Sequence, residues 1–423
     1  MELFKEYEGY CALHEYDAID ESGFVELWKD CFPKVLIREY KAVSGKCRVC
    51  AALSILRSSF RDSKRRLETT CLHAFHRSTY MGERKSYYTR RRDALDNPSE
   101  FCSIITDGMA QSHTILPWLK RLNSSSHTID QHLQGTIQHG QWTNIYRHYT
   151  IMIVPCAIVI ICIRTFGNIG GGANLAIHVI LLDLLDRYER DGSLPQTLYL
   201  RGDGGSENNN KTLLGICELL VARKLVKALF FERLPVGHTH EDIDGVFSRI
   251  WIRMRDLGVI TPQDYRRLVT GVFAAKAGDT NEAKAKMKFV DLYCIPDYKS
   301  FMNPHIDRNF GKVFKEQWTQ LCFRFRSVEV DKDFPTGVEM HYRAYAQDEV
   351  FEIVDSERWE CGKGARKCYV KWYPEGKGMY LLRSFPRGEV QAAPFIPGSR
   401  AAVEAAVKGI LAEHGKYADT TDR

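Results

Sequence analysis

The sequence has no long uninterrupted apolar run and no recognisable leader segment. Its most apolar stretch, Ile151 to Ile163, has 13 residues and contains Pro155. A membrane-spanning helix needs roughly 20 apolar residues. The first residues, Met1 to Glu8, are acidic and lack the basic flank and apolar block of a signal peptide. We therefore expect no membrane contact and interpret residues 151–163 as a buried strand.

Signatures of several other protein classes are also missing. The chain has no internal repeat and no low-complexity tract, and its 44% hydrophobic and 26% charged residues are ordinary for a globular protein. Its 13 cysteines are odd in number and scattered through apolar stretches, which fits reduced thiols better than a disulfide framework. These features favour a reducing compartment, the cytosol or the nucleus. A length of 423 residues predicts two or three packed units.

Positive charge is concentrated in one segment. Residues 57–92 carry eleven Lys or Arg against three Asp or Glu, a net +8 in a chain of net +6, so the remainder is near −2. The segment contains no Pro and predicts one or two helices joined near Thr69 and Thr70. A solvated helix pair is the simplest interpretation, but such a surface also binds phosphates with little sequence preference. The candidate DNA-binding residues are Arg57, Arg61, Lys64, Arg65, Arg66, Arg84, Lys85, Arg90, Arg91 and Arg92.

Two acidic residues end strand-like runs. Asp107 follows the first predicted strand and Asp203 the fourth. The order of predicted elements favours an α/β fold with a mixed sheet, in which the first three strands are antiparallel and the later ones parallel. The first and fourth strands can then lie side by side, so that Asp107 and Asp203 reach one hard cation. Acids at strand ends are also common turn formers.

A third carboxylate is expected in the string Gly-His-Thr-His-Glu-Asp-Ile-Asp, residues 237–244, which leads into a helix. Asp242 and Asp244 flank the predicted buried stripe of that helix by about 100° on either side. Asp242 lies nearer the helix start and is our first choice. Carboxylates in such a cluster can hold two Mg²⁺ ions about 3.5–4 Å apart for phosphoryl transfer. The candidates in the string are Glu241, Asp242 and Asp244, with His238 and His240 as groups that orient water, contact phosphate or bond a carboxylate.

The same string permits another interpretation. It resembles the His-x-His-x-Asp-His motif of the metallo-β-lactamase superfamily, although Ile243 stands in place of the last His. A zinc-dependent hydrolase is therefore an alternative enzyme class. The Gly-rich run after Asp203 lacks the spacing of a P-loop, which excludes nucleotide hydrolysis of that kind.

A pair of thiols precedes the basic segment. Cys47 and Cys50 form a Cys-x-x-Cys pair, and further N and S donors follow about twenty residues later. Four such ligands can close a tetrahedral zinc site that anchors the basic helices. Two incidental thiols are the alternative. The candidate zinc ligands are Cys47, Cys50, Cys71 and His76.

Four strings together resemble a eukaryotic family of transposon-derived proteins with an RNase H-like, DDE/integrase-type transposase core. The strings are Asp107-Gly-Met-Ala-Gln, Gly172-Ala-Asn, Leu198-Tyr-Leu-Arg-Gly-Asp203 with the following Asn-Asn-Lys211, and Leu234-Pro-Val-Gly-His-Thr-His-Glu-Asp-Ile-Asp244.

The resemblance runs from roughly Lys46 to Arg255. It implies a nuclear enzyme that cuts and joins DNA strands, with Asp107 and Asp203 as ligands of Mg²⁺ or Mn²⁺. It also favours Cys47, Cys50 and His76 as zinc ligands. Gly204 stands where such proteins usually carry Asn, so a catalytically inactive, domesticated DNA-binding protein is the second hypothesis.

The expected organisation follows from these assignments. It comprises an N-terminal segment of unclear role (1–40), a basic helical region (41–100), an RNase H-like core (101–275), a small β-rich domain (285–395) and a terminal helix with its tail (396–423). DNA is the expected partner, and the sequence is also compatible with a homo-oligomer.

Overall fold

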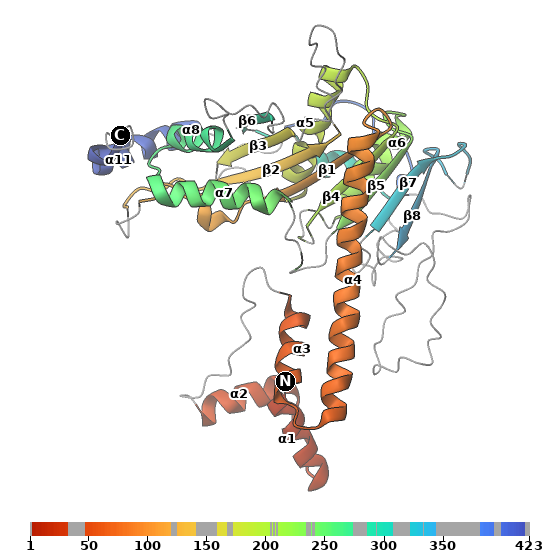
Figure 1. Cartoon of the computed structure of the whole chain (residues 1–423), viewed down its shortest axis with the longest axis vertical. Coiled ribbons are helices and arrows are strands. Elements are labelled where there is room, and N and C mark those ends of the chain that lie inside the picture. Colours follow the sequence, from red (N-terminus) through yellow and green to blue (C-terminus); the bar gives the residue numbers. More distant parts are fainter. Residues whose placement is uncertain are drawn as a thin grey trace.

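The computed structural model shows a sheet with helices on both faces and a long helix that projects away from it (Figure 1). None of its described helices is both long and apolar enough to span a membrane. The structure describes residues 2–32, 47–119, 125–140, 159–166, 172–203, 205, 208, 210–233, 238, 242–273, 286–292, 294–307, 322–332, 334–343, 381–392 and 399–418.

Eight of the described strands form one mixed sheet. They are β1 (Phe101–Gly108), β2 (Gln131–His139), β3 (Val159–Phe166), β4 (Thr197–Gly202), β5 (Ala228–Arg233), β6 (Lys286–Leu292), β7 (Cys322–Ser327) and β8 (Val338–Arg343), in the order β6-β3-β2-β1-β4-β5-β7-β8. β2 is antiparallel to both β1 and β3, β4 is parallel to β1, and β5 is parallel to β4. The expected mixed α/β sheet, with the first strand beside the fourth, is confirmed.

Helices cover both faces of the sheet, and side chains of β1 alternate between the two cores. Cys102 and Ile104 pack in the core that contains α5 and α6, whereas Ile105 packs in the core that contains α7 and α8. The described helices are α1 (Glu2–Leu13), α2 (Glu21–Cys31), α3 (Arg48–Ser59), α4 (Ser63–Asp96), η1 (Gln111–His113), α5 (Ala173–Asp191), α6 (Lys211–Ala222), α7 (Asp242–Leu257), α8 (Pro262–Phe273), α9 (Tyr298–Met302) and α11 (Ser399–Ala418).

The strands that we expected in a separate β domain instead extend the main sheet. β6 pairs with β3 at one edge, and β7 pairs with β5 on the other side, followed by β8. The physical reason is that β3 and β5 would otherwise expose unpaired backbone groups along their outer edges. Residues 344–380 of the expected small domain lie outside the described residues.

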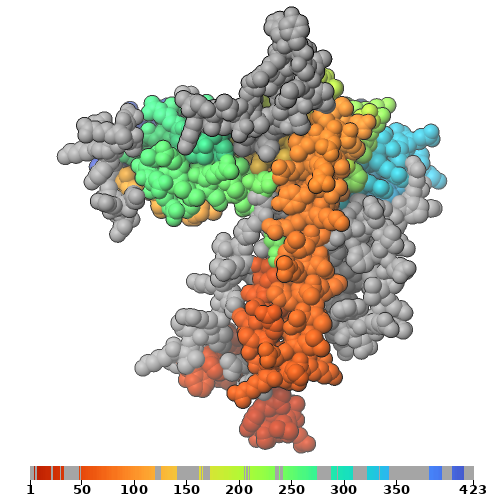
Figure 2. Space-filling model, viewed as in Figure 1, coloured from red at the N-terminus to blue at the C-terminus, as the bar shows by residue number. Residues whose placement is uncertain are grey.

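The basic segment is built around a single long helix. α4 has 34 residues and passes through Thr69 and Thr70 without a break, so of the two expected alternatives the single helix holds at this point. Both threonine hydroxyls donate to backbone carbonyls one turn earlier, at Arg65 and Arg66, so their polar groups are satisfied within the helix. The actual break lies just before Asp62, whose side chain caps the first turn of α4. α3 packs beside the projecting half of α4 (Figures 1 and 2).

Candidate functional site

Asp107 lies near the end of β1, and Asp203 directly follows the neighbouring strand β4. Ile105 of β1 pairs with Arg201 of β4 in a parallel ladder, so two residues further along Asp107 is level with Asp203. Asp107 and Asp203 follow Ile105 and Arg201 by two residues each. Because side chains two residues apart along a strand project on the same face, both carboxylates project on the face that Ile105 and Arg201 share. Parallel neighbours are about 4.8 Å apart. We name this end of β1 and β4 the carboxyl edge.

The Asp203 carboxylate is held by its own loop. Its Oδ1 accepts hydrogen bonds from the backbone N–H of Gly205 at 3.0 Å and from Nδ2 of Asn208 at 2.7 Å. Asn208 is buried and lies against Gly202, where a Cβ atom would come within 2.8 Å of the Asn208 Cγ. Gly202 thus leaves the space that lets Asn208 reach Asp203. Asp107 Oδ1 accepts from the backbone N–H of Gly108 at 2.7 Å.

Asp242, the expected third acid, contacts residues of α4 and β2. Its Oδ2 is 2.6 Å from Nη1 of Arg91 and accepts a hydrogen bond from the Tyr87 hydroxyl at 3.1 Å. The same oxygen is 3.6 Å from Nε2 of His139. His139 pairs with Ser103, four residues before Asp107 in β1, which is about 13 Å along the strand. The Asp242 carboxylate therefore contacts α4 and His139 of β2, while the next residue, Ile243, packs against Gly135, the residue of β2 that pairs with Asp107.

The surroundings of Asp242 keep it ionised. Burial on its own would raise the pKa of this carboxyl, but the contacts with His139, Arg91 and Tyr87 outweigh burial and lower the pKa. Burial lowers the pKa of His139, which favours the neutral imidazole. Asp242 is thus a structural anion that joins the start of α7 to α4.

No described acid of the string completes a carboxylate cluster. Among the residues that the structure describes, no three carboxylates place ligand atoms within 4.8 Å of one another. Asp244 is partly buried on α7, and Glu241 and His240 lie outside the described residues. Asp107 and Asp203, at the carboxyl edge, are the two expected carboxylates that the strand register brings to the same level.

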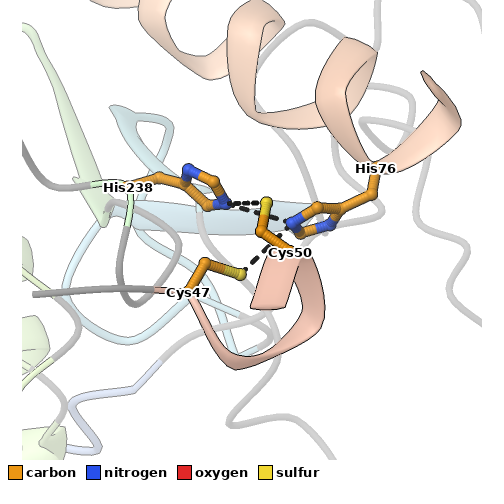
Figure 3. Close-up of side chains that lie close together, drawn as sticks. All are labelled: Cys47, Cys50, His76 and His238. Atoms are coloured by element: carbon orange, nitrogen blue, oxygen red, sulfur yellow. Dashed lines mark hydrogen bonds between the residues drawn. The ribbon is translucent and has the colours of Figure 1, made fainter. Parts of the chain in front are cut away.

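The described residues do contain one group suited to a metal ion. Ligand atoms of Cys47, Cys50, His76 and His238 all lie within 4.8 Å of one another (Figure 3). His76 Nε2 is 3.2 Å from Cys47 Sγ and 3.0 Å from His238 Nε2, and Cys50 Sγ is 3.6 Å from His238 Nε2. We call these four residues the Cys2His2 group. Three of the predicted zinc ligands are in it.

The fourth member differs from the prediction. Cys71 is exposed on α4, whereas His238, from the connection between β5 and α7, completes the group. Tyr80 stacks on the His238 ring, with centroids 3.8 Å apart and planes 13° from parallel. The zinc-hydrolase interpretation needed His238 beside further histidines, but here it faces two thiols and the imidazole of His76.

Burial shapes the protonation of this group. Burial, and secondly the neighbouring Cys47, raises the pKa of the Cys50 thiol. Burial, and secondly the nearby His73, lowers the pKa of His76, which favours the neutral imidazole that a metal requires. Two thiols and two imidazoles form a donor set that suits Zn²⁺ better than Mg²⁺ or Ca²⁺.

The candidate DNA-binding residues fall into two sets. Arg90 and Arg91 face the core: Arg90 pairs with Glu232 and its guanidinium lies over the Tyr199 ring, while Arg91 pairs with Asp242. Their ion pairs dock α4 on the sheet, so these two residues differ from the expected exposed surface. Arg84 is partly buried. The exposed residues of the prediction are Arg57, Arg61, Lys64, Arg65, Arg66, Lys85 and Arg92.

Several residues at these sites escaped the sequence analysis. Asn208 lies in the Gly-rich run after Asp203, in which the sequence analysis singled out only Asp203, and His139 ends a strand without any motif. Their roles depend on pairing across the sheet or within a loop, which spacing does not encode. Tyr80 and Tyr87 were visible only as aromatic residues within a basic segment.

The fold and the sites define an α/β protein with a mixed sheet, a docked basic helix and a Cys2His2 group. Residues 121–348 match the family model described as a domain of unknown function, DUF7869, and the chain belongs to this family. No curated protein and no solved structure matches the chain.

Proposed function

We propose that this protein binds DNA and catalyses metal-dependent cleavage and strand transfer at Asp107 and Asp203. The observation that carries the proposal is the register of the parallel strands β1 and β4, which brings their ends, and with them Asp107 and Asp203, to the same level. The strand order β3-β2-β1-β4-β5, with its antiparallel and parallel pairs, supports the RNase H-like, transposase-type core that the sequence resembles.

Asp107 and Asp203 would hold Mg²⁺ or Mn²⁺, because carboxylate oxygens are the ligands that such hard cations prefer. When bound, these ions activate an attacking hydroxyl and stabilise the leaving oxygen of an in-line displacement. Asn208 and the Gly205 amide orient the Asp203 carboxylate by bonding one of its oxygens. A structural zinc ion in the Cys2His2 group belongs to the same proposal.

The DNA-binding part of the proposal rests on the projecting arm. Figure 2 shows α4, with α3 beside it, extending from the body of the molecule. Exposed basic residues such as Arg61, Arg65 and Arg66 lie around the start of α4. Contacts from Lys and Arg to phosphates position a duplex without selecting its sequence.

A DNA-binding protein without turnover is the second candidate. Asp242 pairs with Arg91, and Asp203 accepts a hydrogen bond from Asn208. Acids with a purely structural role make the same kinds of contact. In this candidate the basic arm binds DNA and the carboxyl edge has no catalytic role.

A cleavage assay on labelled duplex DNA with Mg²⁺ or Mn²⁺ separates the two candidates. We expect the full chain to cut, and Asp107→Asn and Asp203→Asn to bind DNA normally without cutting. Asp256→Asn is the matched control, because Asp256 is an exposed acid at the far end of α7.

Two results would overturn the proposal. If both site variants cut as fast as the unchanged protein, the carboxyl edge is not the catalytic site. If the unchanged protein binds DNA but leaves it intact with either metal, the second candidate is correct.

A further inference from the structure

The Cys2His2 group joins three parts of the chain that are far apart in sequence. Cys47 is the N-cap residue of α3 and Cys50 lies in its first turn, His76 is on α4, and His238 follows β5. The His76 and His238 rings are separated by 162 residues, yet their Nε2 atoms are 3.0 Å apart. The group therefore lies where the arm meets the connection that leads into α7.

The spacing within the group fits a metal ion. A tetrahedral zinc ion with Zn–N of about 2.0–2.1 Å and Zn–S of about 2.3 Å has N–N edges of about 3.3 Å and N–S edges of about 3.5 Å. The observed edges are 3.0 Å for the two Nε2 atoms, and 3.2 and 3.6 Å for the two N–S pairs. Cys47 makes no side-chain capping bond to α3, so its thiol is directed to this group instead.

The location also explains what an ion would do there. α3 has only 12 residues and exposes Val49 and Ile55, so it gains little from its own packing. Isolated helices shorter than about 12–15 residues are marginal in water. A metal bound by Cys47 and Cys50 would fix the start of α3 against α4.

The connection into α7 is held by α4 at two points. His238 contacts His76 and Tyr80, and Asp242, four residues later, pairs with Arg91. The ion pair holds the Asp242 end, and the His238 end lies against Cys50, His76 and Tyr80. A metal at His238 would make this second attachment strong.

We propose that one Zn²⁺ ion, bound by Cys47, Cys50, His76 and His238, fastens both α3 and the connection before α7 to the basic helix α4. This inference deepens the zinc part of the proposed function and does not depend on DNA cleavage. The ion is structural, because four protein ligands close its coordination sphere. It links the DNA-binding arm to the sheet that carries Asp107 and Asp203.

The first test is metal content. We expect the full chain, purified without chelator, to contain about one zinc per molecule, and its Co²⁺ form to show the visible absorption of a tetrahedral site with two thiolates. His238→Ala and Cys50→Ala should each lose the metal. Cys71→Ala is the matched control, because Cys71 is exposed on the same helix as His76 and should leave zinc content unchanged.

The second test is amide hydrogen exchange on the full chain with and without its zinc. Removal of zinc, or His238→Ala, should speed exchange in α3, although His238 is 188 residues from Cys50. Exchange in β1 and β4 should change little, since those strands are held by the core.

The outcomes are distinct from those of the cleavage assay. Full zinc content in His238→Ala, or zinc loss in Cys71→Ala, would overturn the ligand set. Zinc loss without faster exchange in α3 would overturn the fastening role while leaving the metal site. Asp107→Asn should keep its zinc, so a failure of the nuclease proposal leaves this one intact.

Discussion

The guanidinium of Arg91 on α4 lies 2.6 Å from the carboxylate of Asp242, the first residue of α7. Arg91 belongs to the basic segment 57–92, and Asp242 belongs to the string of residues 237–244. Their ion pair joins α4 to the start of α7, and a negative charge at the start of a helix is also favourable. Asp242 thus contributes to the docking of two helices.

Asp242→Ala should lower the free energy of unfolding by about 1–2 kcal/mol, since it leaves Arg91 and the Tyr87 hydroxyl without this partner. The estimate is modest because both charged side chains are about one quarter exposed. Urea unfolding of Asp242→Ala, Arg91→Ala and the double variant measures the coupling. Additive single effects would show that the pair contributes nothing.

Gly202→Ala should disturb the Asp203 loop. The added Cβ would lie 2.8 Å from Cγ of Asn208 and force that side chain away from the Asp203 carboxylate. We expect a loss of about 1–3 kcal/mol in unfolding free energy from overpacking. Gly245→Ala is the control: a Cβ there meets nothing within 4 Å on helix α7, so it should stabilise by about 0.5–1 kcal/mol. Equal effects of the two changes would contradict this interpretation.

Glu218 should make stability depend on pH. Burial raises the pKa of this carboxyl on α6 to about 7, although hydrogen bonds from Thr336 and from the backbone amides of Leu381 and Leu382 act in the opposite direction. The unfolded chain has a glutamate pKa near 4.5. Between these values the unfolded state releases the proton and the folded state keeps it, so stability falls as pH rises.

Thermal or urea unfolding between about pH 4 and 8 checks this. Glu218→Gln should remove a decline of up to about 3 kcal/mol across the window. The difference between the two proteins isolates Glu218, because Asp183, whose pKa burial also raises to about 7, titrates in both. Parallel stability curves would show that Glu218 does not titrate in this range.

The arrangement of the central strands was predictable because it depends on local pattern. Apolar runs that end in Asp107 and Asp203, separated by short loops and then by helices, restrict the sheet to few topologies. The position of His238 in the Cys2His2 group was not predictable, since no spacing rule connects residues 162 apart. The extra strands were misjudged because sequence patterns identify strands but not the edge that they join.

The basic segment shows a different limit of sequence analysis. Arg65 and Arg90 contribute equally to the net charge of the segment. Arg65 is exposed, whereas Arg90 is largely buried against the sheet and pairs with Glu232 of β5. In a sequence, the buried face of a helix is recognised by apolar residues spaced about one turn apart, and α4 has few such residues. Its docked face is instead made of Arg90, Arg91 and Tyr87.

Arg90→Ala should therefore destabilise the fold rather than weaken DNA binding alone. Its side chain is 11% exposed, pairs with buried Glu232 and lies over the Tyr199 and Phe230 rings. Removing one partner of a buried pair typically costs about 3–5 kcal/mol, and Arg201 also contacts Glu232 and should keep the loss near the lower end. Chemical unfolding measures it. A stable variant with weakened DNA binding would place Arg90 in the binding surface instead.

Replacing both Arg65 and Arg66 by Ala should weaken DNA binding without destabilising the protein, because both side chains are exposed on the projecting arm. Each lost phosphate contact lowers the slope of log affinity against log salt by about 0.9, so the pair should lower it by up to about 2. Fluorescence anisotropy with a labelled duplex between about 50 and 200 mM salt gives this slope. Arg253→Ala, an exposed arginine on α7, is the control and should leave the slope unchanged. If the control lowers the slope and the arm variant does not, DNA binds at α7 and the arm has another role.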